Sequence, residues 1–150
     1  MKLKKIRIIN YRCFKDANID FDEHTTLIVG KNGAGKTAIL DAVAVAVSTF
    51  LLGIDGGVGR SILKDDARYE FHDLDGTVDP QHQFPVSIES IGDCLDNHDV
   101  KWVRSLNSES GNTTVKEARE LTNISKEAQK RIMTGDKSLI LPLISYYGTG

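Results

Sequence analysis

The sequence predicts an α/β fold in which an antiparallel β layer accompanies a phosphate-binding loop. Three observations lead to this prediction. Residues 30–37 read G-x-x-x-x-G-K-T and join a short apolar run to a long apolar helix. Short alternating segments stand before the loop and again after the helix. With 150 residues, 40% of them hydrophobic, the chain is long enough for one ordinary globular core.

The residues before the loop predict a hairpin followed by a buried strand. Leu3–Asn10 places Ile6 and Ile8 on one face and charged residues on the other, as a half-buried strand does. Ala17–Phe21 alternates in the same way, so we expect it to pair with the first strand. Thr26–Val29 is continuously apolar or β-branched, which is typical of a strand covered on both faces in a parallel sheet.

The helix after the loop is predicted over Gly35 to about Leu52. It is apolar on most sides, so it should be buried. Gly53 is expected to end it as a helix C-cap. Asp41, Ser48 and Thr49 interrupt the apolar run, which argues against a membrane span.

The second half of the chain begins with an acidic region. Residues 65–99 hold ten acids, one arginine and three of the four histidines. We expect them to contribute to an antiparallel β layer with solvated turns, one of them at Asp75-Gly76. The predicted elements are strands over 67–72, 84–91 and 100–106, a helix over Val115–Met133 closed by Gly135, and a second core strand over Ser138–Tyr147 with Pro142 at an edge or bulge.

Charge indicates where a polyanion would bind, and the cysteines and the N-terminus lead us to expect a soluble, cytoplasmic protein. The net charge of -2 divides into +4 over residues 1–36 and -6 over the remainder, so the loop lies in a basic region that suits a polyanion. The balance gives no support to a broad nucleic-acid-binding face within these residues. Cys13 and Cys94 predict two free thiols in a reducing compartment. The basic start is not followed by an apolar signal core.

The loop has the residue types that a nucleoside triphosphate requires. Glycines let the backbone approach close-set phosphate oxygens, and successive N–H groups form an anion nest at the helix N-terminus. Lys36 is expected to reach the β- and γ-phosphates and Thr37 Oγ to bind Mg²⁺. The predicted binding residues are Asn32, Gly33, Ala34, Gly35, Lys36, Thr37 and Ala38.

Other patterns point to chemistry less specifically. Residues 73–76 read D-x-x-G, but no apolar strand leads into them and no N-K-x-D motif occurs, so we interpret them as a solvated turn. His72, His82 and His98 match no usual metal-ligand spacing and are expected in exposed loops. Tyr146 and Tyr147 suit either a core or interface position or base stacking.

Two stretches together resemble a known family. The segment LKKIRIINYRCFKDANIDFDEHTTLIVGKNGAGKTAILDAV is similar to the N-terminal segment of ABC-type P-loop ATPases of the SMC, RecF and DNA-repair group. In that group an N-[FY]-R-x-F turn, here Asn10–Phe14, precedes a G-x-N-G-[AS]-G-K-[ST] loop. The resemblance covers roughly the first 50 residues.

The resemblance implies a fold and a function. The chain would be the first lobe of an ABC-type ATPase head that binds ATP and Mg²⁺, with Arg12 on the nucleotide phosphates and Lys36 serving catalysis. In this group each ATP is held between two subunits, which implies a homodimer or higher oligomer acting on DNA or RNA. The stretches AVAVAVSTFLLGIDG and LPLISYYGTG further resemble PtuA ATPases of Septu and retron-associated anti-phage systems. That narrower resemblance implies a nuclease partner.

The departures from the family leave hydrolysis open. A Q-loop glutamine, a signature Ser-Gly motif, an apolar strand ending in Asp-Glu and a switch histidine are not identifiable in this sequence. We therefore expect residues 1–150 to be the N-terminal part of an ATPase domain, with these motifs beyond residue 150. Two other functions remain: a P-loop small-molecule kinase, and a non-hydrolysing nucleotide-dependent scaffold for a nuclease.

Overall fold

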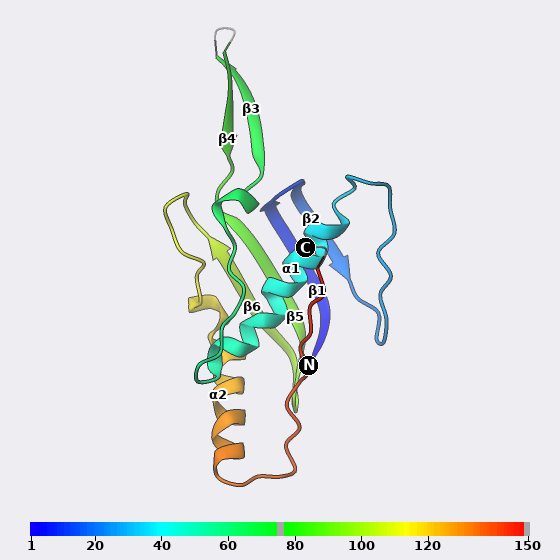
Figure 1. Cartoon of the computed structure of the whole chain (residues 1–150), viewed down its shortest axis with the longest axis vertical. Coiled ribbons are helices and arrows are strands. Elements are labelled where there is room, and N and C mark those ends of the chain that lie inside the picture. Colours follow the sequence, from blue (N-terminus) through cyan, green and yellow to red (C-terminus); the bar gives the residue numbers. More distant parts are fainter. Residues whose placement is uncertain (75–76, 149–150) are drawn as a thin grey trace.

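A four-stranded antiparallel sheet forms the centre of the computed structural model, which describes residues 1–74 and 77–148 (Figure 1). Its strand order is β2-β1-β5-β6. Two of its strands come before the phosphate-binding loop in the sequence, and the other two come well after it. The strands are β1 (Lys2–Tyr11), β2 (Phe14–Asp20), β5 (Val86–Cys94) and β6 (Asn97–Leu106).

The predicted N-terminal hairpin is confirmed. β1 and β2 pair antiparallel, with Ile6 opposite Ile19 and Ile8 opposite Ala17. β1 also pairs with β5 along its other edge, so it lies inside the sheet. Ile6 and Ile8 are completely buried whereas Arg7 between them is exposed, as the alternation predicts.

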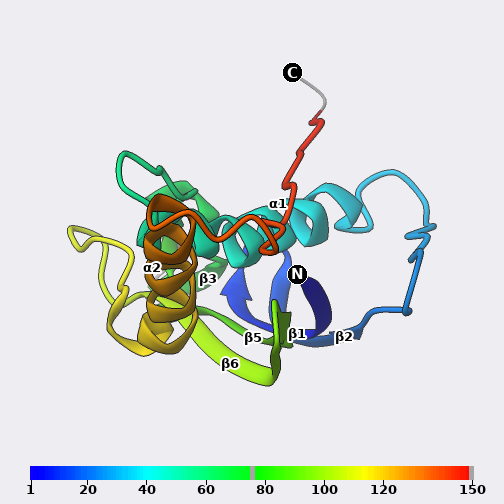
Figure 2. The ribbon, with the colours of Figure 1, turned by 90° about the horizontal axis from the view of Figure 1, so that it is seen from below.

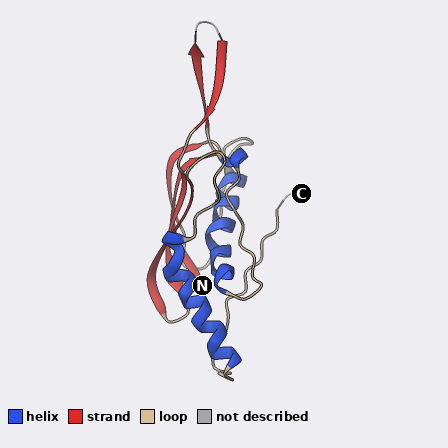
Figure 3. Cartoon of the chain, turned by 90° about the vertical axis from the view of Figure 1, so that its left-hand side faces the viewer, coloured by secondary structure: helices blue, strands red, loops and turns tan. Residues whose placement is uncertain are grey.

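Helix α1 (Lys36–Ser48) continues into the 3₁₀ helix η1 (Thr49–Gly53), and together they form the predicted helix. Figure 3 shows the helices on one side of the sheet. The span Lys36–Gly53 has the length and hydropathy of a membrane helix. Its side chains at Ala42, Val45 and Ala46 belong instead to the core cluster that includes the inner face of the sheet, so it is a core helix.

Gly53 ends the helical segment for a reason different from the one predicted. It does not have the positive φ of a left-handed cap. A Cβ at Gly53 would lie 1.8 Å from Ser125 Oγ and 2.3 Å from the Thr122 carbonyl oxygen. The position requires glycine because helix α2 (Arg119–Met133) packs directly on the backbone.

A second core cluster lies between α2, η1 and β6. Trp102 is 1% exposed and packs there with Phe50 and Leu121. Its Nε1 donates to the Ala46 carbonyl oxygen at 3.0 Å, so its one polar atom is satisfied in the core. The short 3₁₀ helix η3 (Lys116–Ala118) leads into α2, and Gly135 follows it with φ 92°, which confirms the predicted helix end.

A two-stranded ribbon extends from the body of the protein (Figure 1). It consists of β3 (Tyr69–Leu74) and β4 (Thr77–His82), preceded by the 3₁₀ helix η2 (Lys64–Asp66). A strand near β3 was predicted, but β4 was not, because its polar residues and Pro80 show no strand pattern. The predicted Asp75-Gly76 turn and the D-x-x-G pattern include residues that lie outside the described part.

Two predictions of core strands are wrong. Thr26–Val29 and Ser138–Tyr147 form no strand. Leu27, Val29 and Leu143 are 81%, 78% and 93% exposed. Figure 2 shows the segment that leads into α1 running away from the sheet. A strand buried on both faces needs hydrogen-bonded neighbours, and neither segment has one among the described residues.

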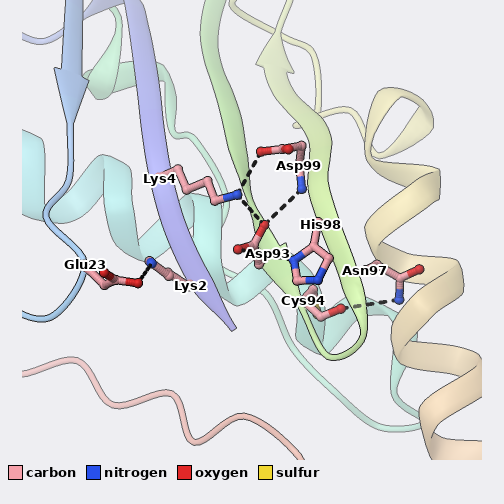
Figure 4. Close-up of polar contacts among 8 residues, drawn as sticks. All are labelled: Lys2, Lys4, Glu23, Asp93, Cys94, Asn97, His98 and Asp99. Carbon is pink, nitrogen blue, oxygen red and sulfur yellow. Dashed lines mark hydrogen bonds and ion pairs between the residues drawn. The ribbon is translucent and has the colours of Figure 1, made fainter.

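A group of charges joins one end of β1 to the neighbouring ends of β5 and β6 (Figure 4). Lys4 Nζ lies 2.6 Å from Asp93 Oδ1 and 2.8 Å from Asp99 Oδ1, and the Asp99 N–H donates to Asp93. The hydrogen bond from Lys4 is the main reason that the pKa of Asp93 falls to about 2. Lys2 and Glu23 form a separate pair beside it at 2.8 Å.

Candidate functional site

The glycine-rich loop adopts the backbone that its sequence predicts. Gly33 and Gly35 have φ of 81° and 86°, which L-residues rarely adopt, and Gly35 is the N-cap of α1. Gly30 matters because it has no side chain: a Cβ at this position would lie 3.3 Å from Ala34 Cβ, which is a tight contact. Asn32, Gly33 and Ala34 are exposed, so the loop backbone is accessible to a ligand.

Lys36 lies at the first position of α1 and turns back across the loop. Its Nζ donates to the carbonyl oxygens of Gly30 and Lys31, both at 2.8 Å. The carbonyl groups of the loop therefore hold the Lys36 ammonium group next to the backbone that is predicted to bind phosphate. Thr37 is exposed and Ala38 is buried against the core.

The turn between β1 and β2 packs against this loop. A Cβ at Gly35 would lie 2.6 Å from Phe14 Cζ and 2.7 Å from Cys13 Sγ. Asn10 and Arg12 have φ of 49° and 50°, so the turn reverses the chain tightly. The two motifs that resemble the ATPase family are thus in contact through Gly35, which the sequence alone did not show.

Arg12 is fixed by two carboxylates. Its Nε donates to Asp66 Oδ1 at 2.8 Å and its Nη1 donates to Asp41 Oδ2 at 2.5 Å. The Arg12 guanidinium also lies 5.4 Å from the centre of the Tyr11 ring. Its side chain keeps 33% of its surface exposed, so it remains accessible to a ligand.

Asp41 is the buried centre of this arrangement. It is 4% exposed and lies on α1, one helical turn after Thr37. Besides Arg12, it pairs with Arg60 at 2.9 Å and accepts the hydroxyl of Tyr146 at 2.5 Å. The Arg60 guanidinium stacks 5.1 Å from the centre of the Tyr146 ring. One carboxylate therefore contacts three segments that are far apart in sequence.

The charges of this cluster stabilise one another. Burial alone disfavours ionisation of Asp41, but the Tyr146 hydroxyl and the neighbouring guanidiniums outweigh it and hold the pKa of Asp41 below its ordinary value. Burial also opposes the charge of Arg12, yet the two carboxylates raise the pKa of its guanidinium. Burial raises the pKa of the adjacent Tyr11 hydroxyl. Arg12 is thus a cation and Asp41 an anion at neutral pH.

Sequence reasoning identified Arg12 but missed Asp41, Asp66 and Arg60. A signal for Asp41 was present, because an acid inside an otherwise buried apolar helix needs a cationic partner. Nothing in the sequence identified which cation it would be. Asp66 belongs to a short 3₁₀ helix that was not predicted.

The remaining candidates lie elsewhere. His82 lies on β4, where its ring centre is 4.1 Å from that of Tyr69, and His98 lies on β6, 3.5 Å from Asp93 of β5. The expectation that these two histidines lie in loops is therefore wrong. The side chain of His72 lies outside the described part. The structure does not bring His82 and His98 to the loop. Tyr147 is 92% exposed, whereas Tyr146 joins the Asp41 cluster.

The residues of the loop fit a nucleoside triphosphate with Mg²⁺. The exposed backbone between Asn32 and Gly35 and the two left-handed glycines provide the anion nest that a polyphosphate needs. Lys36 supplies a cation at the same point. Thr37 offers a single hydroxyl, which suits Mg²⁺ because this ion takes only one or two protein ligands beside phosphate oxygens and water.

Loop geometry and fold define the class of protein: this is a lobe with the P-loop NTPase fold. The sequence as a whole gives the particular family. A family model described as an AAA domain matches residues 5–150, and the chain belongs to that family.

Curated relatives match mainly around the loop. The DNA double-strand break repair Rad50 ATPase of Archaeoglobus fulgidus is 50% identical over 44 residues, 29% of this chain and 5% of the relative. The DNA replication and repair protein RecF of Flavobacterium johnsoniae is 49% identical over 43 residues, 29% of this chain and 12% of the relative. RecF of Chlorobium phaeobacteroides is 33% identical over 89 residues, 59% of this chain and 23% of the relative. The chain thus spans less than a quarter of these relatives.

One solved structure, from work on ATP-driven dimerization and DNA-stimulated activation of SMC ATPases, shares the fold. It has a TM-score of 0.52 and 19% identity, and the match covers 83% of this chain and 80% of that chain. Together with the family match, it confirms the predicted α/β fold of a P-loop lobe with an antiparallel β layer. The predicted resemblance to the SMC and RecF group is confirmed as well.

Proposed function

We propose that this chain is the ATP- and Mg²⁺-binding lobe of an ATPase whose nucleotide-driven dimerisation controls a DNA-related assembly. The observation that carries the proposal is the loop: two left-handed glycines and the Lys36 ammonium lie together at the start of a buried helix. Backbone N–H groups from Asn32 to Ala38 would hold the phosphates, Lys36 would neutralise them, and Thr37 would bind Mg²⁺.

Arg12 would bind a phosphate oxygen from the side of the β1–β2 turn. Its contact with two carboxylates fixes the guanidinium, and a third of its side chain remains exposed. Mg²⁺ would screen the charge that develops on the phosphates. The contribution of Lys36 and Arg12 is then to place positive charge where the γ-phosphate lies, which is the main requirement of phosphoryl transfer.

Lys36→Ala tests the proposal. We expect it to abolish detectable ATP binding by titration calorimetry in the presence of Mg²⁺, because the loop loses its cation, while the circular dichroism spectrum stays unchanged. Lys31→Ala in the same loop is the matched control, since the Lys31 side chain carries no predicted phosphate contact. ATP binding by Lys36→Ala with the affinity of the unchanged protein would contradict the proposal.

The rest of the ATPase head is proposed to pair with the exposed segments on either side of this lobe. Thr26–Val29 and Ser138–Tyr147 are largely apolar, and they have no strand partner among the described residues. Strands from another part of the full-length protein would cover them and supply the hydrolytic acid and the signature motif. Hydrogen exchange of residues 26–29 in the full-length protein tests this proposal: fast exchange of these amides would contradict it.

The dimeric state is proposed from the solved SMC structure, where the described event is ATP-driven dimerization with DNA-stimulated activation. In this protein ATP would act as the contact between two copies, and its hydrolysis would release them. Light scattering of the full-length protein with ATP, ADP and no nucleotide tests the proposal. A molar mass that is the same in all three conditions would contradict it.

A cytoplasmic anti-phage role with a nuclease partner is the more specific proposal. Its support is the resemblance of AVAVAVSTFLLGIDG and LPLISYYGTG to PtuA ATPases. Cys13 and Cys94 form no disulfide, which is compatible with the cytoplasm. Phage plaque counts on host cells carrying either the natural gene or its Lys36→Ala variant test this role. Equal counts would contradict it.

A single-turnover assay separates hydrolysis from the two other functions. With radiolabelled ATP and the full-length protein, we expect phosphate release without an acceptor. Transfer of the label to an acceptor would indicate a small-molecule kinase instead. Tight ATP binding without turnover would indicate a nucleotide-dependent scaffold.

A further inference from the structure

We propose that Asp41 is a positioning residue for the nucleotide site: it holds the Arg12 guanidinium beside the phosphate loop and fastens the segment containing Tyr146 to the same point. The inference rests on the proposed ATP binding and extends it to residues that sequence motifs do not mark. Asp41 accepts hydrogen bonds from Arg12 at 2.5 Å and from Tyr146 at 2.5 Å.

The position of Asp41 on α1 places this cluster near the phosphates. Thr37 and Asp41 are four residues apart, so they share a face of the helix and are separated by about 6 Å along its axis. Side chains on a helix lean toward its N-terminus, which here is the phosphate loop. The groups bound to Asp41 are therefore collected about one turn from the hydroxyl proposed to bind Mg²⁺.

The contacts of Arg12 explain why a positioning residue is needed. A free arginine side chain loses rotamer freedom when it binds phosphate, which weakens binding. Here Asp66 holds Nε and Asp41 holds Nη1, so the orientation of the guanidinium is set before a ligand arrives. The planar group has further N–H donors, and its side chain is 33% exposed.

The Asp41 carboxylate is itself held in place by burial and by two further partners. It is 4% exposed, and Arg60 and Tyr146 approach its second oxygen at 2.9 Å and 2.5 Å. Both oxygens of the carboxylate are thus occupied, one by Arg12 and the other by residues from distant segments. Figures 1 and 2 show the chain returning past α1 after α2, which brings Tyr146 to this helix.

The sign of the effect on ATP affinity distinguishes positioning from simple electrostatics. If Asp41 acted only as a nearby negative charge, its neutralisation would strengthen the binding of a polyanion. If it positions Arg12, neutralisation weakens binding, because the guanidinium loses one of its two anchors. The two roles therefore predict changes in opposite directions for the same isosteric substitution.

The experiment is a double-mutant cycle on ATP affinity, measured by titration calorimetry on the full-length protein with Mg²⁺. We expect Arg12→Ala to weaken ATP binding tenfold or more and Asp41→Asn about fivefold, because a charge-assisted hydrogen bond is lost in the first and misplaced in the second. The double variant should bind like Arg12→Ala alone, since Asp41 acts through Arg12.

Asp16→Asn is the matched control. Asp16 binds Arg7 through two hydrogen bonds of 3.0 Å and 2.8 Å on the β1–β2 hairpin, away from the Asp41 cluster. Removing this pair changes the same charge by the same substitution, so we expect ATP affinity to stay within about twofold. A fivefold loss in this control would overturn the assignment to Asp41.

Tyr146→Phe keeps the proposal testable if Asp41→Asn does not fold. It removes only the hydroxyl that holds Asp41, so ATP affinity should fall about twofold in the natural background and not at all beside Arg12→Ala. Limited proteolysis should also cut residues 137–148 faster, because their attachment to α1 is weakened.

Besides a fivefold loss in the Asp16→Asn control, four results would overturn the inference. These are unchanged or tighter ATP binding by Asp41→Asn, full additivity with Arg12→Ala, unchanged affinity of Arg12→Ala, and additivity of Tyr146→Phe with Arg12→Ala. In all four the natural protein still binds ATP, so the proposed binding of ATP by the loop stands; unchanged affinity of Arg12→Ala would in addition remove the phosphate contact proposed for Arg12. Absence of ATP binding by the natural protein overturns the proposed function itself, and the inference with it.

Discussion

The inner face of the sheet and the two exposed apolar segments contain the same kinds of residues but have opposite environments. Ile6, Ile88 and Trp102 are at most 1% exposed beneath the helices. Val29 and Leu143 are 78% and 93% exposed, although the segments that contain them are at least as apolar as the strands of the sheet. The difference shows that hydrophobicity gives a segment the capacity to be buried, while a partner with free hydrogen-bonding edges decides whether it is.

Truncation of Trp102 should reveal the largest contrast between the two regions. Trp102→Ala leaves a cavity in the second core cluster and removes the hydrogen bond to Ala46, so we expect the free energy of unfolding to fall by about 3–5 kcal/mol. Leu143→Ala should change it by less than about 0.5 kcal/mol. Urea denaturation of residues 1–150 measures both, and similar losses would mean that Leu143 is packed.

Gly35→Ala should have the next largest effect, because Gly35 connects the folded hairpin to the loop. Its φ is 86° and a Cβ would meet Phe14 and Cys13. We therefore expect the free energy of unfolding to fall by about 1–3 kcal/mol and ATP binding to be lost. Gly33→Ala shares the positive φ, but its Cβ would meet no atom within 4 Å. For Gly33→Ala we expect the free energy of unfolding to fall by about 1 kcal/mol. Equal losses would exclude packing against the turn as the cause.

Val29→Lys tests the exposed segments directly. In residues 1–150 we expect a change in the free energy of unfolding of less than about 0.5 kcal/mol, because the side chain faces solvent. In the full-length protein, a lysine in a strand covered on both faces should cost at least about 2 kcal/mol. Thermal and urea denaturation of both lengths give the comparison, and a small effect in both would argue against the proposed pairing.

Acid should produce the smallest change, at the group formed by Lys4, Asp93 and Asp99 on β1, β5 and β6. The pKa of Asp93 is about 2 in the folded protein against an ordinary 3.8, so its stabilising contribution is present above about pH 4 and is lost as the pH falls toward 2. Melting temperatures between pH 5 and pH 2 should fall less steeply in Asp93→Asn. Parallel curves would show that the Lys4 interaction contributes nothing to stability.

Local patterns predicted much of the fold and of the loop. Alternation of Ile6 and Ile8 gave the first hairpin, the apolar run after Lys36 gave α1, and Gly135 ended α2 as expected. These features depend on neighbours a few residues apart, so the sequence contains the whole signal. The roles predicted for Asn32 to Ala38 remain predictions, although the loop has the backbone they require.

Long-range features were not predictable in the same way. The environment of Thr26–Val29 and Ser138–Tyr147 depends on which strands lie beside them, and periodicity carries no information on this. Gly53 was assigned to a helix cap, whereas it is required by the approach of α2 some seventy residues later. The ribbon strand β4 forms because β3 pairs with it, despite a polar sequence.

By itself the sequence determined that this protein has a phosphate-binding loop at the start of a buried helix, because glycine, lysine and threonine act there through short-range backbone geometry and charge. Only the tertiary structure decided what surrounds that loop. Arg12, Asp41, Arg60 and Tyr146 come from four separate segments, and a buried carboxylate selects its cations by proximity in space rather than along the chain.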